Sequence, residues 1–285
     1  MKNNHFMSTN STGFHRVAYT EWGAAAAPST ILCVHGLTRN GRDFDALAAA
    51  LAAAARVVCP DVVGRGDSGW LTDSAGYAYA QYLDDMTALI ARLDTDRVDW
   101  IGTSMGGLIG MFMAAKPNTP VRRLILNDVG PFIPKAALQR IADYVGTDRT
   151  FADVAEVDAH LRSVHATFGN LSDSQWRHLA EHSVRPVDDG RLALHYDPAI
   201  ADAFRTGPVE EIGDLDLWPV WDAITCPVLV LRGAESDLLL AETAAEMATR
   251  GPRAEVVEIA GCGHAPMLMD ESQIAVIRDW LRATA

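Results

Sequence analysis

The chain has 285 residues, of which 49% are hydrophobic and 21% charged, and its formal net charge is −13. A chain of this length can bury one large core, so we expect one large domain with room for an insertion. The acidic balance argues against nucleic acid and anionic membranes as partners, because no excess of basic residues is available to release counterions from phosphate groups.

The first residues of the chain are polar, with Phe6 and Met7 as the sizeable hydrophobic side chains, and residues 1–13 are predicted to form a flexible tail. They include no apolar segment typical of a signal peptide. No later run approaches the about 18 consecutive apolar residues that a membrane-spanning helix requires. The sequence therefore predicts a cytoplasmic protein that does not bind membranes and is a monomer or a homodimer.

Predicted strands and helices alternate along most of the chain, which favours the α/β class with a doubly wound, mostly parallel sheet. Residues 132–222 differ, because they show helical periodicity and no buried strand. We therefore predict a core formed by residues 14–131 and 223–285, with 132–222 inserted as a helical cap. The predicted strands cover residues 14–22, 30–34, 56–60, 98–101, 121–126, 228–231 and 255–259.

One short motif lies between the predicted strand at 98–101 and an apolar helical segment. Gly102, Ser104 and Gly106 fit the pattern G-x-S-x-G, in which a sharp turn lifts a serine hydroxyl clear of the backbone. The glycines avoid a clash of side chains with the backbone at the two sides of the serine. The helix that follows directs its positive end at the same place. The motif predicts a nucleophilic serine.

Other motifs follow in order along the chain: His35-Gly36 after a buried strand, Asp61-x-x-Gly64-x-Gly66-x-Ser68, and Gly263-His264 after the last strand. With G-x-S-x-G and Asp237 after the strand at 228–231, this order resembles that of the α/β-hydrolase superfamily, and the resemblance covers residue 14 to the end. It implies an α/β-hydrolase fold with a catalytic triad of serine, acid and histidine.

The resemblance assigns His264 as the general base that activates Ser104. An acid must then hold the tautomer of the histidine and stabilise its protonated form. Asp237 is our predicted acid, although it stands four residues after Gly233 where many relatives have the acid three residues after the glycine. Two alternatives stay open: Glu235 in the same loop, and Asp128 at the end of the preceding strand.

The negative charge that develops on the substrate oxygen requires backbone N–H donors. By resemblance these are the N–H groups of Leu37 and Met105, and His35 is expected to order the turn before Leu37. The loop of residues 61–68 is expected to brace the sheet rather than bind phosphate or metal. No group of His, Asp and Glu has metal-binding spacing, so neither a metal nor a cofactor is predicted.

A serine at the elbow excludes the aspartate-based dehalogenases and epoxide hydrolases of this fold. The predicted activity is hydrolysis of a small or medium carboxylic ester or lactone through an acyl-serine intermediate. Alternatives are carbon–carbon hydrolysis of vinylogous diketones, cofactor-free perhydrolase or haloperoxidase activity, and a small-molecule receptor on a hydrolase scaffold. Candidate residues for the substrate pocket are Arg39, Phe132, Trp176, Trp221 and Met267.

Overall fold

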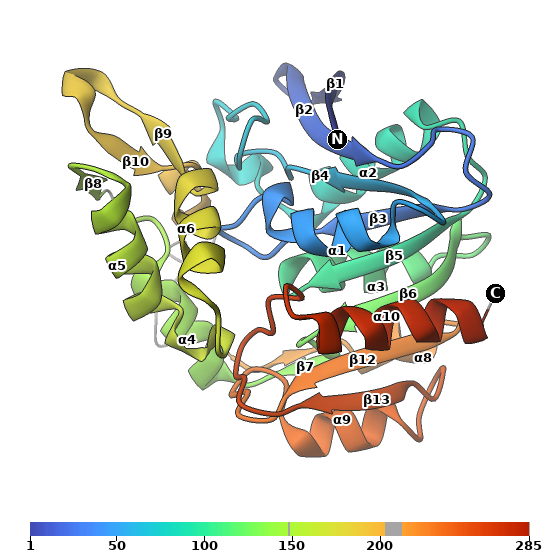
Figure 1. Ribbon diagram of the computed structural model, residues 1–285. Helices are drawn as coiled ribbons and strands as arrows, with labels where there is room; N and C mark the ends of the chain where they lie inside the picture. The colour runs from blue at the N-terminus through green and yellow to red at the C-terminus, as the bar shows by residue number, and fades with distance from the viewer. Residues whose placement is uncertain (148, 203–212, 285) are drawn as a thin grey trace.

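An eight-stranded sheet runs through the computed structural model, which describes residues 1–147, 149–202 and 213–284 (Figure 1). The strand order is β1-β2-β4-β3-β5-β6-β12-β13, with β1 and β2 antiparallel to their neighbours and the others parallel. The predicted α/β fold with a mostly parallel sheet is confirmed. The strands are β1 (Lys2–Asn10), β2 (Gly13–Trp22), β3 (Thr30–Val34), β4 (Arg56–Pro60), β5 (Val98–Thr103), β6 (Val121–Asn127), β12 (Val228–Gly233) and β13 (Glu255–Ile259).

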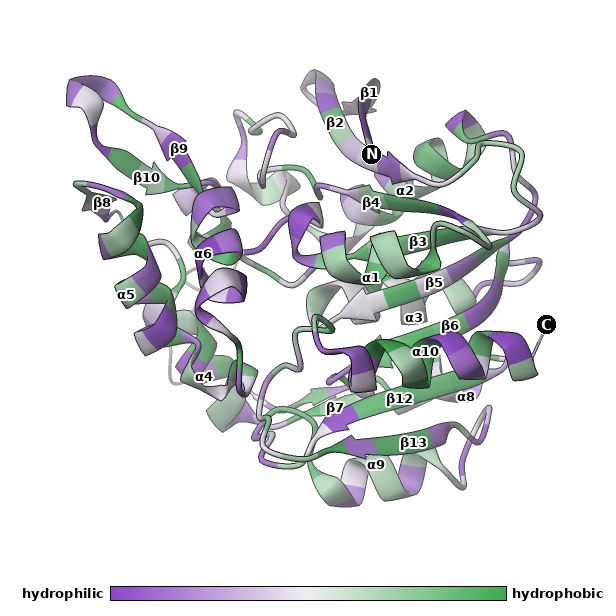
Figure 2. Cartoon of the chain, in the orientation of Figure 1, coloured by the Kyte–Doolittle hydropathy of each residue, from purple (hydrophilic) through white to green (hydrophobic). Residues whose placement is uncertain are grey.

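Helices cover both faces of the sheet, and the central strands are apolar on both sides (Figure 2). Because side chains alternate along a strand, Ile31 and Cys33 pack on the face of α1 and α10 while Leu32 and Val34 pack on the other face. This burial on both sides explains the continuous apolar runs in the sequence. The helices are α1 (Asp45–Leu51) and α10 (Glu271–Ala283) on one face, and α2 (Tyr79–Arg92), α3 (Met105–Ala114), α8 (Trp218–Asp222) and α9 (Ala241–Met247) on the other.

The N-terminal residues form a strand rather than the predicted flexible tail. Strand β1 pairs with β2 along its whole length, and the Asn10 side chain accepts hydrogen bonds from the backbone of Thr12 and Gly13 in the connecting turn. Asn4, Phe6 and Ser8 turn toward the protein, and the Phe6 ring packs near that of Tyr19. An edge strand held by backbone hydrogen bonds leaves little apolar periodicity in the sequence, which is why the prediction was wrong.

The segment predicted as a helical cap contains strands as well as helices, so that expectation is corrected. Three short strands form a sheet in the order β8-β10-β9, and β7 pairs with β11. Strands of two or three residues are too short to leave a period in the sequence. Residues 148 and 203–212 of the predicted cap lie outside the described residues. The elements are β7 (Phe132–Ile133), α4 (Lys135–Tyr144), β8 (Thr150–Phe151), α5 (Val154–Val164), α6 (Asp173–His182), β9 (Val184–Pro186), β10 (Leu192–Leu194) and β11 (Leu215–Asp216).

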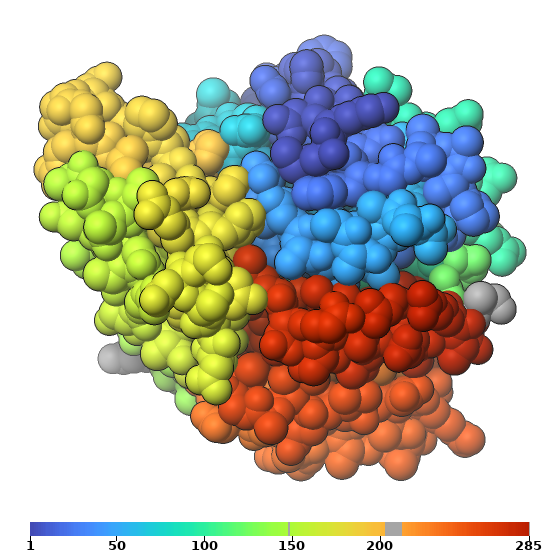
Figure 3. Space-filling view, viewed as in Figure 1, coloured from blue at the N-terminus to red at the C-terminus, as the bar shows by residue number. Residues whose placement is uncertain are grey.

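The cap forms a separate layer beside the core, and it is coloured green to yellow in the space-filling view (Figure 3). It has its own apolar cluster, which includes Phe151, Leu161 and Trp176. In Figure 1 the cap faces the ends of the parallel strands, where loops from β5, β6, β12 and β13 converge. Ligands bind at this edge in open α/β sheets. None of the helices in the described ranges has the length and apolar character needed to cross a bilayer.

Candidate active site

Ser104 lies at the turn between β5 and α3 with a backbone conformation of φ 52° and ψ −117°. This conformation is costly for a residue with a side chain, and the surrounding structure holds it in place. A Cβ atom on Gly102 would lie 2.3 Å from the carbonyl oxygen of Gly106, and one on Gly106 would lie 2.0 Å from that of Val34. The motif therefore requires both glycines so that the turn can pack against β3.

His264 joins Ser104 to an acid. Its Nε2 lies 3.0 Å from the Oγ of Ser104, and its Nδ1 lies 2.8 Å from Oδ2 of Asp128. The histidine stands in the loop after β13, the serine after β5 and the aspartate after β6. Hydrogen bonds thus connect three residues that are far apart in the sequence. Such a chain allows the ring to accept the serine proton while the carboxylate stabilises the resulting charge.

Asp128, rather than the predicted Asp237, contacts His264. The Asp128 side chain is fully buried, and it accepts hydrogen bonds from the Gly233 backbone at 2.7 Å and from the Ser236 hydroxyl at 2.6 Å. Ser236 stands three residues after Gly233, where many relatives carry the acid. The last residue of β12 and the loop after it therefore supply an N–H and a hydroxyl that orient the carboxylate of Asp128.

Asp237 itself points away from the histidine, so its predicted role is corrected. Its carboxylate is half-exposed and pairs with Arg140 of the cap, with oxygen–nitrogen distances of 2.6 and 2.8 Å. Glu235, the other alternative in this loop, is exposed. The sequence signal for Asp128 was its place directly after a buried strand, which alone did not distinguish it from Asp237.

The backbone N–H groups of Leu37 and Met105, the predicted oxyanion donors, have no hydrogen-bond acceptor among the residues that the structure describes. Met105 is the first residue of α3, where the N–H groups have no partner within the helix. Both residues line the space next to Ser104. The arrangement leaves two donors available for an oxygen that becomes negative.

His35 orders the turn that carries Leu37. Its Nδ1 donates to the carbonyl oxygen of Gly36 at 2.7 Å, while its Nε2 accepts from the Val62 N–H at 2.9 Å. Complete burial lowers the pKa of His35 to about 4, so the ring is neutral at neutral pH. This neutral tautomer satisfies both contacts, and the residue has the structural position that the sequence suggested.

Arg65, from the loop of residues 61–68, is a fully buried guanidinium behind the same turn. Its Nε donates to the carbonyl oxygen of Leu37 at 2.8 Å, and its Nη1 donates to Val63 and to the hydroxyl of Tyr82. These contacts hold the Leu37 carbonyl in the turn that also carries the Leu37 N–H. Through Arg65, the loop of residues 61–68 therefore supports the turn that carries Leu37.

Two clefts border Ser104, and they differ in character. The polar lobe, with an empty volume of about 730 Å³ that includes the solvent at its mouth, also contains His264. The apolar lobe lies toward α2 and α4 and is about 640 Å³ on the same measure. The polar lobe is lined by Thr38, Arg39, Arg140, Tyr144, His165 and Thr167 together with apolar side chains that include Phe44, Ile141, Val164 and Phe168, and the apolar lobe by Tyr77, Tyr79, Leu108, Ile133, Leu138 and Leu238.

Of the five predicted pocket residues, Arg39 and Met267 line the polar lobe. Trp176 is instead buried inside the cap, stacked parallel to Phe168, and Trp221 is buried in the core with its indole N–H on the Arg250 carbonyl. Phe132 is also not part of either lobe. The side chain of the next residue, Ile133, lines the apolar lobe instead, because successive strand residues face opposite sides.

His165, Arg140 and Tyr144 line the polar lobe and were missed in the sequence. All three belong to cap segments whose packing against the core depends on long-range contacts. Arg39 illustrates the same point. It pairs with Asp43 four residues later in the sequence, and it also donates to the Ser183 hydroxyl of the cap at 2.8 Å.

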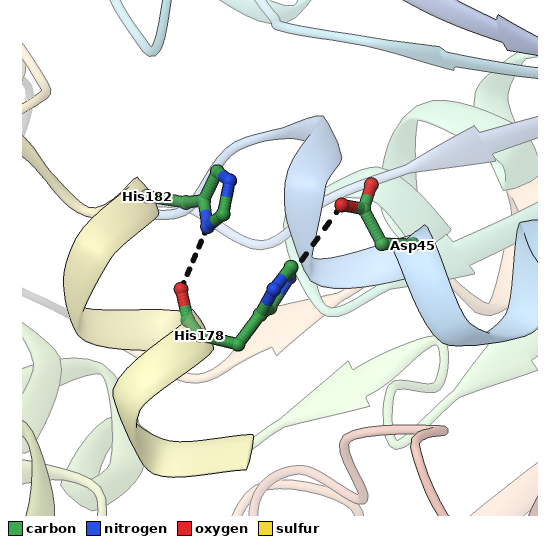
Figure 4. A group of neighbouring side chains, drawn as sticks. All are labelled: Asp45, His178 and His182. Carbon is green, nitrogen blue, oxygen red and sulfur yellow. Dashed lines mark hydrogen bonds and ion pairs between the residues drawn. The ribbon is translucent and has the colours of Figure 1, made fainter. Parts of the chain in front are cut away.

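Asp45, His178 and His182 form one group in the described residues that resembles a metal site, with candidate ligand atoms within 4.8 Å of one another (Figure 4). All three side chains already have hydrogen-bond or ion-pair partners within the protein. Asp45 pairs with Arg42, His178 Nε2 donates to the Arg42 carbonyl at 3.0 Å, and His182 Nδ1 donates to the His178 carbonyl at 2.8 Å. The group joins α6 of the cap to the core, and none of its three residues lines a cleft that contains Ser104.

A serine, a histidine and a buried aspartate at the carboxyl edge of this sheet define an α/β hydrolase. The model of the alpha/beta hydrolase family matches residues 31–277, and the chain belongs to this family. It is 51% identical over 269 residues to a 3-hydroxybutyrate-oligomer hydrolase of Cupriavidus necator. The matched region covers 93% of this chain and 92% of that protein.

More distant relatives extend the comparison. A 2-(acetamidomethylene)succinate hydrolase of Mesorhizobium japonicum is 29% identical over 235 residues, which covers 82% of this chain and 81% of that protein. The solved structure of an alpha/beta hydrolase from Novosphingobium aromaticivorans superposes with a TM-score of 0.87 at 39% identity, covering 99% of this chain and 98% of the other. The family and these relatives identify the chain as a hydrolase.

Proposed function

We propose that this protein is a serine esterase that hydrolyses short oligomers of 3-hydroxybutyrate. The observation that carries the esterase part is the hydrogen-bonded chain from Ser104 through His264 to Asp128. The substrate class is supported by the relative from Cupriavidus necator, which is 51% identical over nearly the whole length of both proteins. An oligomer of this kind is a chain of carboxylic esters, which fits the chemistry of the site.

The reaction follows from the geometry. His264 takes the proton of Ser104 as Oγ attacks the ester carbonyl, and the N–H groups of Leu37 and Met105 stabilise the oxyanion. Collapse of the tetrahedral intermediate breaks the ester bond, and His264 gives its proton to the leaving alkoxide oxygen. A water molecule, deprotonated by His264, then attacks the acyl-serine, releases the carboxylic acid and regenerates Ser104.

The two lobes suit the two sides of such an ester. The aromatic and aliphatic side chains of the apolar lobe, among them Tyr79, Leu108 and Leu238, match the methyl-bearing acyl chain. The polar lobe also borders Ser104 and carries groups that can form hydrogen bonds with a substrate. A substrate that spans Ser104 would contact both lobes.

The test is turnover of the 3-hydroxybutyrate dimer and trimer, together with a chain-length panel of p-nitrophenyl esters and lactones, by wild type and Ser104→Ala. We expect multiple turnovers by wild type and a loss of at least about a thousandfold in the variant. Equal rates in the two proteins would contradict the serine mechanism. Ester turnover without cleavage of dimer or trimer would contradict the substrate, and binding without turnover would favour a receptor.

A further inference from the structure

The polar lobe has a positively charged side within a chain of net charge −13. Two guanidinium groups, those of Arg39 and Arg140, line it next to His165. Their carboxylate partners, Asp43 and Asp237, neutralise them in part. Whether the lobe attracts an anion therefore depends on which N–H groups these pairs leave available.

Arg140 keeps a free donor group. It pairs with Asp237 through Nε and Nη2, while its Nη1 has no partner among the described residues. The arginine side chain is 43% exposed and lines the same lobe as Ser104. Arg39 differs, because it uses Nε, Nη1 and Nη2 on Asp43 and Ser183. Arg140 can therefore donate to a ligand while Asp237 holds the guanidinium in place.

His165 offers a second donor. Its ring stacks on Phe168 at a centroid distance of 4.4 Å and meets Tyr144 edge-on, and neither ring nitrogen has a hydrogen-bond partner in the described part of the chain. Burial lowers the pKa of His165 well below its usual value, and the charge of Arg39 lowers it further. The ring is thus a neutral donor at a position where the neighbouring arginines create a positive potential.

We propose that the polar lobe binds the terminal carboxylate of the oligomer, through Nη1 of Arg140 and the ring N–H of His165, so that the ester bond nearest the carboxyl end is cleaved. The inference rests on the proposed function. In a 3-hydroxybutyrate oligomer only two carbon atoms separate that ester oxygen from the carboxylate carbon. A carboxylate so close to the scissile bond must bind in the cleft of Ser104, and an arginine is well suited to hold it.

The experiment compares two substrates with the same scissile ester: the 3-hydroxybutyrate dimer, and the same dimer with its carboxylate replaced by a neutral carboxamide. Wild type should cleave the acid at least about tenfold more efficiently, measured as kcat/KM. Arg140→Gln should reduce kcat/KM for the acid dimer by about tenfold to a hundredfold, mainly through KM, and bring the acid-to-carboxamide ratio close to one. Arg140→Lys should have an acid-to-carboxamide ratio between those of Arg140→Gln and wild type. His165→Phe, which keeps an aromatic ring, should have a lower ratio than wild type.

Arg177→Gln is the matched control, because Arg177 is an exposed cap arginine that also pairs with a carboxylate, that of Glu181, and lies outside the polar lobe. It should leave the ratio unchanged. The inference would be overturned if wild type cleaved both dimers with equal kcat/KM, or if Arg140→Gln lost the same factor in kcat/KM on both dimers. Either result would leave the proposed function standing. Turnover of p-nitrophenyl butyrate without cleavage of either dimer would overturn both.

Discussion

The core and the cap contribute to the site in different ways. In the core, the Ser104, His264 and Asp128 side chains are joined by hydrogen bonds, and the carboxylate is fully buried. In the cap, Arg140 is half-exposed and pairs with an aspartate that is also half-exposed. Buried hydrogen bonds hold the catalytic groups in a fixed geometry, and breaking one of them costs considerable free energy. An exposed ion pair contributes little free energy, so its members can exchange partners easily. We therefore expect large effects from core substitutions and smaller ones from the cap.

The largest difference is expected between the two aspartates. Asp128→Asn should lower kcat for p-nitrophenyl butyrate by about a thousandfold to ten-thousandfold, because an amide neither holds the required tautomer of His264 nor stabilises its protonated ring. Asp237→Asn removes a solvent-exposed ion pair and should change kcat by less than about fivefold. Steady-state kinetics on both folded variants decide this, and the opposite ranking would restore Asp237 as the acid.

A second core prediction concerns stability. Burial lowers the pKa of His35 from 6.5 to about 4, so between these values the unfolded chain binds a proton that the folded chain does not. The contribution of His35 to the free energy of unfolding is therefore complete above pH 6.5 and falls as the pH decreases to 4, by up to about 3 kcal/mol. Urea unfolding of wild type and His35→Gln should show a stability difference that narrows over this range. A difference that stays constant with pH would show that the folded histidine titrates normally.

The smallest effect is expected where the cap meets the core. The Ser183 hydroxyl accepts from Arg39 at 2.8 Å and donates to the Leu179 carbonyl at 2.5 Å. Ser183→Ala removes both bonds and should lower the free energy of unfolding by about 1 kcal/mol. Ser163→Ala, at an exposed position of the cap helix α5, serves as the control and should change stability by less than about 0.5 kcal/mol. Equal effects of the two substitutions would show that this contact does not stabilise the seam.

The sequence predicted the part of the site that depends on local structure. The turn around Ser104 requires glycine at fixed positions, and His264 follows a recognisable strand, so both residues could be named from motifs. The acid could not be settled in this way. Asp128 and Asp237 both follow buried strands, and the choice depends on Ser236, whose hydroxyl binds the carboxylate of a strand about a hundred residues earlier.

The cap was predicted less well for a related reason. Its two- and three-residue strands leave no period, and its apolar residues pack partly on one another, as Trp176 does on Phe168. An aromatic residue in such a segment has the same appearance in the sequence whether it faces a substrate or the cap interior. His165 and Arg140 acquire their positions only when α4 and α5 fold back over the core.

The pairing of β7 with β11 places the entry and the exit of the cap side by side. The Leu217 N–H also donates to the Pro131 carbonyl at 2.7 Å, and the strands that flank the insertion, β6 and β12, are neighbours in the sheet. The whole intervening segment is therefore bounded by two adjacent points on the core. An exchange of this segment between relatives would alter which substrates are accepted without changing the order of the sheet strands. The fold thus allows specificity to diversify by replacing one module while the triad is inherited intact.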